Sequence, residues 1–131
     1  MLTQQIRQYQ QTQIMTSSGV QIVVLLYDAA IQSIELARAG IESNNIKDKG
    51  RFLGRAISIV GELNSVLDFE RGGDIAPQLN RLYEYILTEL VTANARNSTR
   101  HLEGPLRCLT TLREGWQEVA AQQQHEVGAA R

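Results

Sequence analysis

Residues 19–42 carry apolar side chains on two sides of one predicted helix, and this feature constrains the fold more than any other. One row has the three- and four-residue spacing of a helix that faces a core: Val20, Val23, Val24, Tyr27, Ala30, Ile31, Ile34 and Ile41. A second row lies roughly opposite: Ile22, Leu25, Leu26, Ala29 and Leu36. A helix that is apolar nearly all round must bury both sides. We therefore expect the chain's own bundle to cover the first row. The second row needs the N-terminal segment, a second copy or another protein.

Three further segments show helical spacing, and short turn sequences separate them. The second predicted helix runs from about Lys47 to Phe69, the third from about Ile75 to Ala95, and the fourth follows Ser98. Their core positions are Phe52, Leu53, Ala56, Ile57, Ile59, Val60, Leu63, Val66 and Leu67, then Ile75, Leu79, Leu82, Ile86, Leu90 and Ala93, then Leu102, Leu106, Leu109, Leu112, Trp116 and Val119. Short connections place successive helices antiparallel. The sequence therefore predicts an all-α, antiparallel up-and-down four-helix bundle.

The prediction divides the chain into three parts. Residues 1–18 form a flexible or short-helical N-terminal arm, because this glutamine-rich segment is too polar to hold a helix alone. Residues 19–124 form the bundle, and residues 125–131 a frayed tail. Asp74 is expected to cap the third helix, and Pro105 to kink the fourth.

Glycines and cations on the second predicted helix have simple interpretations. Gly50, Gly54 and Gly61 each cost about 1 kcal/mol relative to alanine inside a helix. We therefore expect another helix or a bound segment to approach the backbone there. The basic run of Lys47, Lys49, Arg51 and Arg55 is interrupted by an aspartate and is interpreted as a solvated face.

Composition excludes several classes of protein. The 131 residues fit one domain, and 43% hydrophobic with 21% charged residues is typical of soluble globular chains. A formal net charge of −1 gives no field that would hold nucleic acid. The longest apolar run has six residues, far short of a membrane span, and the N-terminus has no signal-peptide pattern. A single cysteine fits a reducing compartment, so we expect a cytoplasmic location without membrane insertion.

Residues that could support catalysis lack partners in the sequence. Neither His101 nor His125 follows a glutamate by three positions, as a di-iron bundle requires, so no metal site is predicted. Cys108 is interpreted as a small buried hydrophobe. A phosphotransfer role for His101 is disfavoured, because Glu103 stands where a cation is wanted and Pro105 follows. We expect no cofactor and no enzymatic activity.

Several short stretches in a fixed order carry a resemblance to a known family. They are YQQ (9–11), LLYDAA (25–30), AISIVGELN (56–64), RGGDIA (71–76), LYEY (82–85), LVTAN (90–94) and LREGW (112–116). Together they resemble the flagellar export chaperone family FliS across nearly the whole chain. One departure is Gly104 with Pro105, where the family is expected to carry helix-forming residues.

The resemblance implies a cytoplasmic chaperone for export of flagellin. Such a protein binds the disordered C-terminal segment of flagellin in hydrophobic grooves of the bundle. It prevents premature polymerisation and assists delivery to the flagellar type III export apparatus. The arm resembles a lid, anchored here by Ile6 and Tyr9. The groove residues would be Ile22, Leu25, Leu26, Ala29, Ile57, Gly61, Asn64, Leu67, Tyr83, Tyr85 and Ile86.

Two alternatives remain beside this interpretation. A structural or regulatory helical module would pair with a copy of itself through the same apolar row, and it would have no flagellin client. A phosphotransfer domain would accept phosphate on His101. The sequence also leaves open whether the protein contacts an export-gate component, an anti-sigma factor or a co-chaperone.

Overall fold

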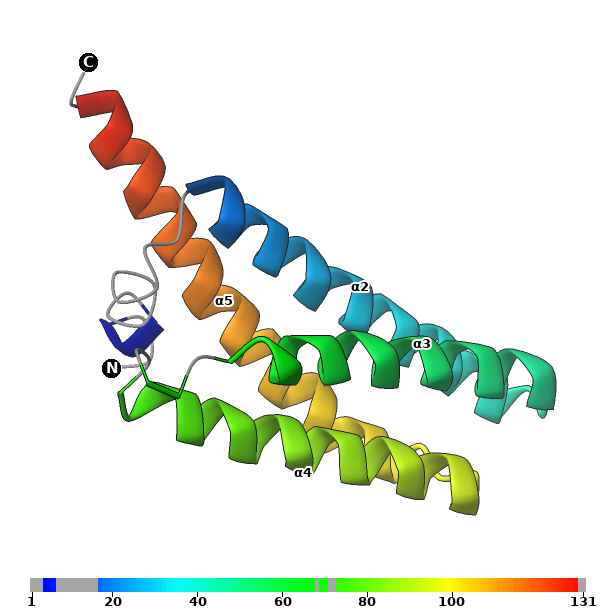
Figure 1. Cartoon of the computed structure of the whole chain (residues 1–131). Coiled ribbons are helices and arrows are strands. Elements are labelled where there is room, and N and C mark those ends of the chain that lie inside the picture. The colour runs from blue at the N-terminus through cyan, green and yellow to red at the C-terminus, as the bar shows by residue number, and fades with distance from the viewer. Residues whose placement is uncertain (1–3, 7–16, 68, 71–72, 130–131) are drawn as a thin grey trace.

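Four long helices make up the fold. The computed structural model describes residues 4–6, 17–67, 69–70 and 73–129, without the side chains of 17–18 and 123–129. The helices are α2 (Ser17–Glu42), α3 (Ile46–Ser65), α4 (Ile75–Arg96) and α5 (Arg100–Ala129). Each packs antiparallel against the next, and α5 returns alongside α2 (Figure 1). A helical turn at residues 4–6 adds a short N-terminal piece. The predicted all-α antiparallel architecture is confirmed.

Asparagines make the two tight turns at one end of the bundle. Asn44 follows α2 with a φ of 57°, and Asn97 follows α4 with a φ of 50°. Both lie in the left-handed region that asparagine tolerates better than most residues. Asn45 then caps α3, because its Oδ1 accepts from the backbone N–H of Asp48 at 3.1 Å. These turns reverse the chain within a few residues and align the helices they join.

Lys49 is buried between the turns and links three helices. Its ammonium donates to the backbone carbonyl of Asn94 at 3.2 Å and to Oδ1 of Asn97, so it satisfies the C-terminal end of α4. Its own backbone lies against Gly40 of α2, where an added Cβ would come within 2.9 Å of the Lys49 nitrogen. Lys49 therefore does not belong to a solvated basic face, and its interpretation as such was wrong.

The core follows the predicted stripes with one exchange on α4. Leu82 was expected inside but is 36% exposed, whereas Tyr83, expected off the stripe, is only 2% exposed. Tyr83 lies four residues after Leu79 and three before Ile86, which is the spacing of residues on one face of a helix, so all three face inward. The Tyr83 hydroxyl hydrogen-bonds the hydroxyl of buried Tyr27 on α2. Each phenol thus has a polar partner inside the bundle.

Helix ends differ from the predictions in four places. α2 begins at Ser17, two residues before the expected boundary. α3 stops at Ser65 rather than near Phe69, with its last turn tightened by a bond from the Leu67 N–H to the Asn64 carbonyl. Asp74 precedes α4 without a side-chain cap. α5 continues to Ala129, so the segment predicted as a frayed tail is helical through that residue.

α2 is unusually apolar. Gly19–Glu42 is long and apolar enough to cross a membrane by length and composition alone, although only 33% of its most apolar window is buried inside the bundle. The same test is met by the core helices of soluble proteins. Here α2 packs along both α3 and α5, which bury its inward row. The outward row, with Ile22, Leu25 and Leu36 exposed, adds to its apolar composition.

Two glycine substitutions test this packing. Gly40→Ala should lower the free energy of unfolding by about 1–3 kcal/mol, because its Cβ would meet the backbone of Lys49 at 2.9 Å. Gly54→Ala should raise the same quantity by about 0.5–1 kcal/mol, because no atom lies within 4 Å of its Cβ position. Chemical denaturation of both variants measures the difference. Equal effects of the two substitutions would contradict the close approach at Gly40.

Candidate partner-binding surface

Contacts between helices fix which flank of each helix faces which neighbour. On α2, Gly40 meets α3, whereas Asp28 pairs with Arg113 of α5. On α3, Asn64 accepts a hydrogen bond from Asn80 of α4 at 2.8 Å. Successive residues of a helix are rotated by about 100° about its axis. Once one residue is known to face a neighbouring helix, the direction of every other residue of the same helix follows.

The second apolar row of α2 lies on the flank that faces α3. Counting from Gly40, the 100° step puts Ile22, Leu26 and Ala29 on the same flank, with Leu25 further out. On α3, the flank away from Asn64 faces α2, and it carries three apolar side chains. Together these residues form what we call the α2–α3 face: Ile22, Leu25, Leu26, Ala29, Leu36, Phe52, Ile59 and Val66.

Half of the residues of the α2–α3 face are exposed in the described structure, and the other half, Leu26, Ala29, Phe52 and Ile59, are partly buried. Leu25 is 64% exposed, Val66 60% and Ile22 57%, which are high values for large aliphatic side chains. Burial of each such side chain would contribute about 1.5–3 kcal/mol of hydrophobic free energy. The sequence prediction that α2 has an apolar row without cover inside the bundle agrees with these exposures.

The other predicted groove residues lie elsewhere. Ile57, Gly61 and Asn64 are on the α4 side of α3, and Leu67 follows the last turn of α3 and is half buried. Tyr83 and Ile86 were expected in the groove, but they are buried in the core at 2% and 0% exposure. The groove prediction was therefore wrong for Tyr83 and Ile86, because the rotation of α4 turns them into the core. For Ile57, Gly61, Asn64 and Leu67, which are partly exposed, it stays a prediction.

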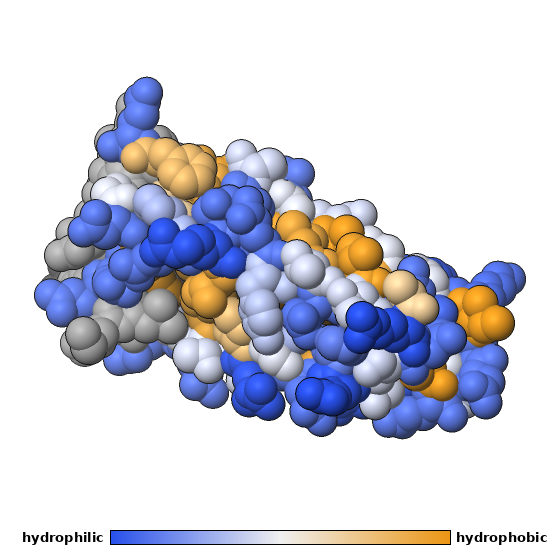
Figure 2. Space-filling model, turned by 90° about the horizontal axis from the view of Figure 1, so that it is seen from below, coloured by the Kyte–Doolittle hydropathy of each residue, from blue (hydrophilic) through white to orange (hydrophobic). Residues whose placement is uncertain are grey.

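Tyr85 lies on yet another side, against α5. An added side chain at Gly104 would overlap the Tyr85 hydroxyl and lie 3.1 Å from its Cζ, so the absent side chain makes room for this ring. Glycine at position 104 thus has a packing reason. Figure 2, which views the molecule from the α4 side, shows separate hydrophobic patches between polar side chains rather than one continuous surface.

Sequence reasoning missed three members of the α2–α3 face. Phe52, Ile59 and Val66 were assigned to the core of the second helix. They are spaced by seven residues and form one edge of a stripe that is wider than the inward face of a helix in this bundle. The width of this apolar stripe indicated that some of its residues lie outside the core. The sequence did not show which neighbouring helix these residues face.

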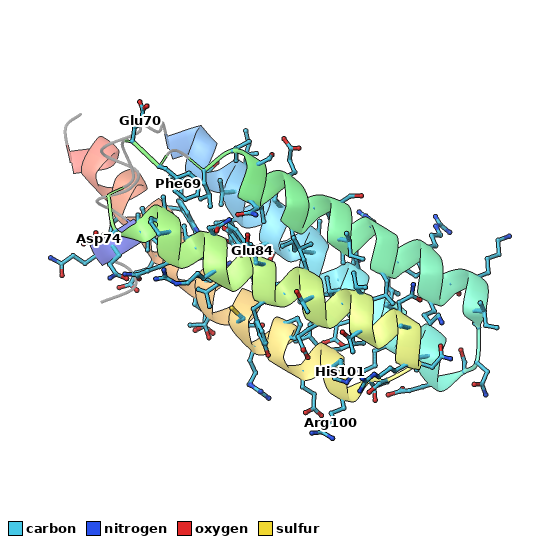
Figure 3. All side chains as sticks on the ribbon, turned by 60° about the horizontal axis from the view of Figure 1, so that its bottom comes forward. Phe69, Glu70, Asp74, Glu84, Arg100 and His101 are labelled. Carbon is cyan, nitrogen blue, oxygen red and sulfur yellow. The ribbon has the colours of Figure 1, made fainter. Side chains whose placement is uncertain are left out.

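The N-terminal turn packs at one end of the bundle. Ile6 is fully buried and belongs to the core cluster. Figures 1 and 3 both place residues 4–6 beside the start of α4 and the C-terminal half of α5. Phe69, 55% exposed, and Glu70 lie at this same end, whereas His101 lies at the other (Figure 3). Tyr9, the second predicted anchor, lies outside the described residues, so a lid over the α2–α3 face stays a prediction.

Two titratable side chains, Cys108 and His101, are partly buried between helices. Burial raises the pKa of the Cys108 thiol, which lowers its thiolate fraction at neutral pH. His101 lies with its Nδ1 3.0 Å from a carboxylate oxygen of Glu89, which links α5 to α4. In the part of the chain that the structure describes, no three His, Cys, Asp or Glu side chains are grouped closely enough to hold a metal ion.

Fold and surface together define a class: a small antiparallel helical bundle with an exposed apolar face. Residues 2–123 match the family model of the flagellar protein FliS, so the chain belongs to the FliS family, which is non-enzymatic. The chain is 36% identical to flagellar secretion chaperone FliSB of Pseudomonas aeruginosa over 87% of this chain and 94% of that protein. It is 33% identical to flagellar secretion chaperone FliS of Salmonella typhimurium, covering 82% and 80% of the two chains. A Bacillus subtilis relative of the same name is 29% identical, covering 85% and 82%.

Truncation on the two sides of α2 distinguishes the open face from the core. Leu25→Ala should change the free energy of unfolding by less than about 0.5 kcal/mol, because the side chain is mostly exposed. Ile34→Ala should lower it by about 2–4 kcal/mol, because Ile34 is fully buried. Urea unfolding followed by circular dichroism measures both values. A large loss for Leu25→Ala would mean that the α2–α3 face is already covered in the free protein.

Proposed function

We propose that this protein is a cytoplasmic export chaperone that binds the disordered C-terminal segment of flagellin through the α2–α3 face. The observation that carries the proposal is the exposed apolar row of α2 beside the apolar edge of α3. Membership of a family of flagellar secretion chaperones supports the nature of the client. Bound flagellin is thereby kept from polymerising before it reaches the flagellar type III export apparatus.

The recognition follows the helix-in-groove mode. A disordered segment folds as an amphipathic helix and lays its apolar side chains on the α2–α3 face. Hydrophobic burial drives the association, and the cost of ordering the segment reduces the net affinity. This cost makes release feasible, which an export chaperone needs. Ile57 and Asn64 on the neighbouring flank provide further contact for a client that extends over α3.

The N-terminal arm acts in this proposal as a removable cover. Ile6, fully buried at the end of the bundle, anchors it. An arm held at one point can shield apolar surface in the free protein and leave when a client arrives. Because only molecules with the arm undocked can bind, the apparent affinity for the client is the intrinsic affinity multiplied by the fraction of such molecules.

Titration calorimetry with a peptide covering the C-terminal disordered segment of flagellin tests the function. We expect 1:1 binding with a negative heat-capacity change and a gain of helical circular dichroism. Leu25→Asp should reduce the affinity at least tenfold, because binding would bury an unpaired carboxylate. Thr111→Asp is the matched control, since it adds the same charge at an exposed position of α5 and should leave the affinity unchanged.

Two results would contradict the proposal. The wild-type protein could stay folded yet show no heat with the peptide, or the Leu25→Asp variant could bind normally. The self-association alternative makes a different prediction: a stable dimer by light scattering that Leu25→Asp dissociates. Phosphotransfer would require acid-labile phosphate on His101, which half-buried contact with Glu89 does not favour.

A further inference from the structure

Charged side chains are distributed unevenly along the border of the α2–α3 face. Arg51 and Arg55 lie on the outer flank of α3 that turns toward α2, in the half nearer the α2–α3 turn. Glu62 occupies the same flank two to three turns further on, toward the end of α3. The border is therefore basic at one end and acidic at the other.

The two arginines are available to a bound chain. The guanidinium carbon of Arg51 lies 5.2 Å from the centroid of the Phe52 ring, so this side chain leans over an apolar member of the face. Arg55 is exposed, and within the described part of the chain neither arginine forms an ion pair. Asp48, the nearest acid on α3, is held by the side-chain amide of Asn45 at 3.0 Å.

α2 contributes no compensating charge to this border. The charged side chains of α2 are Asp28, Glu35, Arg38 and Glu42, and the 100° step from Gly40 puts all four on the flank away from α3. Asp28 pairs there with Arg113, and Glu35 with Arg38. The positions of α2 that border the face are apolar or neutral, as Gln32 is. Near the turn, the border of the face therefore carries Arg51 and Arg55 against the single carboxylate of Asp48, which leaves a net positive charge.

We infer that the client binds this face as a helix in one direction, with acidic side chains over Arg51 and Arg55 and its C-terminal end toward the α2–α3 turn. This inference rests on the proposed function and adds the chemistry and polarity of the client. The bound helix then runs parallel to α2 and antiparallel to α3. Glu62 faces the N-terminal half of the bound helix.

Two electrostatic effects favour this direction. The carbonyl end of a helix carries a partial negative charge and the amide end a partial positive charge, so each end meets the opposite charge on α3. Carboxylates on the client flank also gain a bidentate partner in an arginine. Apolar burial alone has little directional preference, because apolar side chains run along both helices from one end of the face to the other. The charges therefore select the direction that burial leaves open.

Charge reversal tests the contact to acidic groups. The double variant Arg51→Glu with Arg55→Glu should weaken binding of the flagellin C-terminal peptide about threefold to twentyfold, and the loss should shrink in high salt. Arg81→Glu is the matched control, because Arg81 is an exposed cation on α4, outside the α2–α3 face, and its reversal should change the affinity less than twofold. A second double variant, with glutamine at both positions, gives an intermediate loss.

A spin label determines the direction. A nitroxide on the C-terminal end of the peptide should broaden amide signals of Asn44 and Asn45 at the α2–α3 turn, and a label on the N-terminal end those of Val66 and Phe69. The opposite pattern, or an unchanged affinity of the Glu double variant, would overturn the inference while the peptide still binds. Absence of any binding to the wild-type protein would instead overturn the proposed function.

Discussion

The structure depends on one constraint: α2 has apolar side chains on two flanks, and the bundle can bury only one of them. Its inward row reaches the centre, where Tyr27 meets Tyr83 of α4 and the two phenols satisfy each other. Its outward row, with Leu25 64% exposed, remains open beside α3. The four described helices pack on the inward row only, so the exposure of the outward row is a consequence of how many helices surround α2 rather than of poor packing.

The remaining features keep this open face in position. Lys49 joins the ends of three helices near the turns, and Gly40 lets α2 and α3 approach at the same level. Because α2 and α3 are fixed at that end, their apolar edges stay side by side along the bundle. Polar pairs lie at the other three junctions: Asn64 with Asn80 between α3 and α4, His101 with Glu89 between α4 and α5, and Asp28 with Arg113 between α2 and α5. The face is thus presented by a rigid framework, which lowers the ordering cost on the chaperone side of the proposed complex.

The two flanks of α2 carry different kinds of side chains and therefore suit different kinds of ligand. The α2–α3 face combines aliphatic side chains with a basic border and suits an amphipathic helix. On the opposite flank of α2, a cavity of about 480 Å³ is lined by Glu35, Arg38, Glu103 and Arg107 with two threonines and Leu106. Four charged side chains of both signs line that cavity, whereas the members of the α2–α3 face are all apolar. The two flanks of one helix therefore differ in kind, and only the former matches a segment that folds by burying apolar groups.

The sequence by itself determined the number of helices, their approximate limits and the existence of an apolar row without cover, because these depend on local periodicity and turn residues. It also determined the family, through the ordered stretches from residue 9 to 118. Only the tertiary structure decided that Tyr83 and Ile86 are core, that Tyr85 packs on Gly104, and that Phe52 borders the open face. Rotation of each helix about its axis sets these outcomes, and that rotation is fixed by contacts between helices rather than by spacing within one.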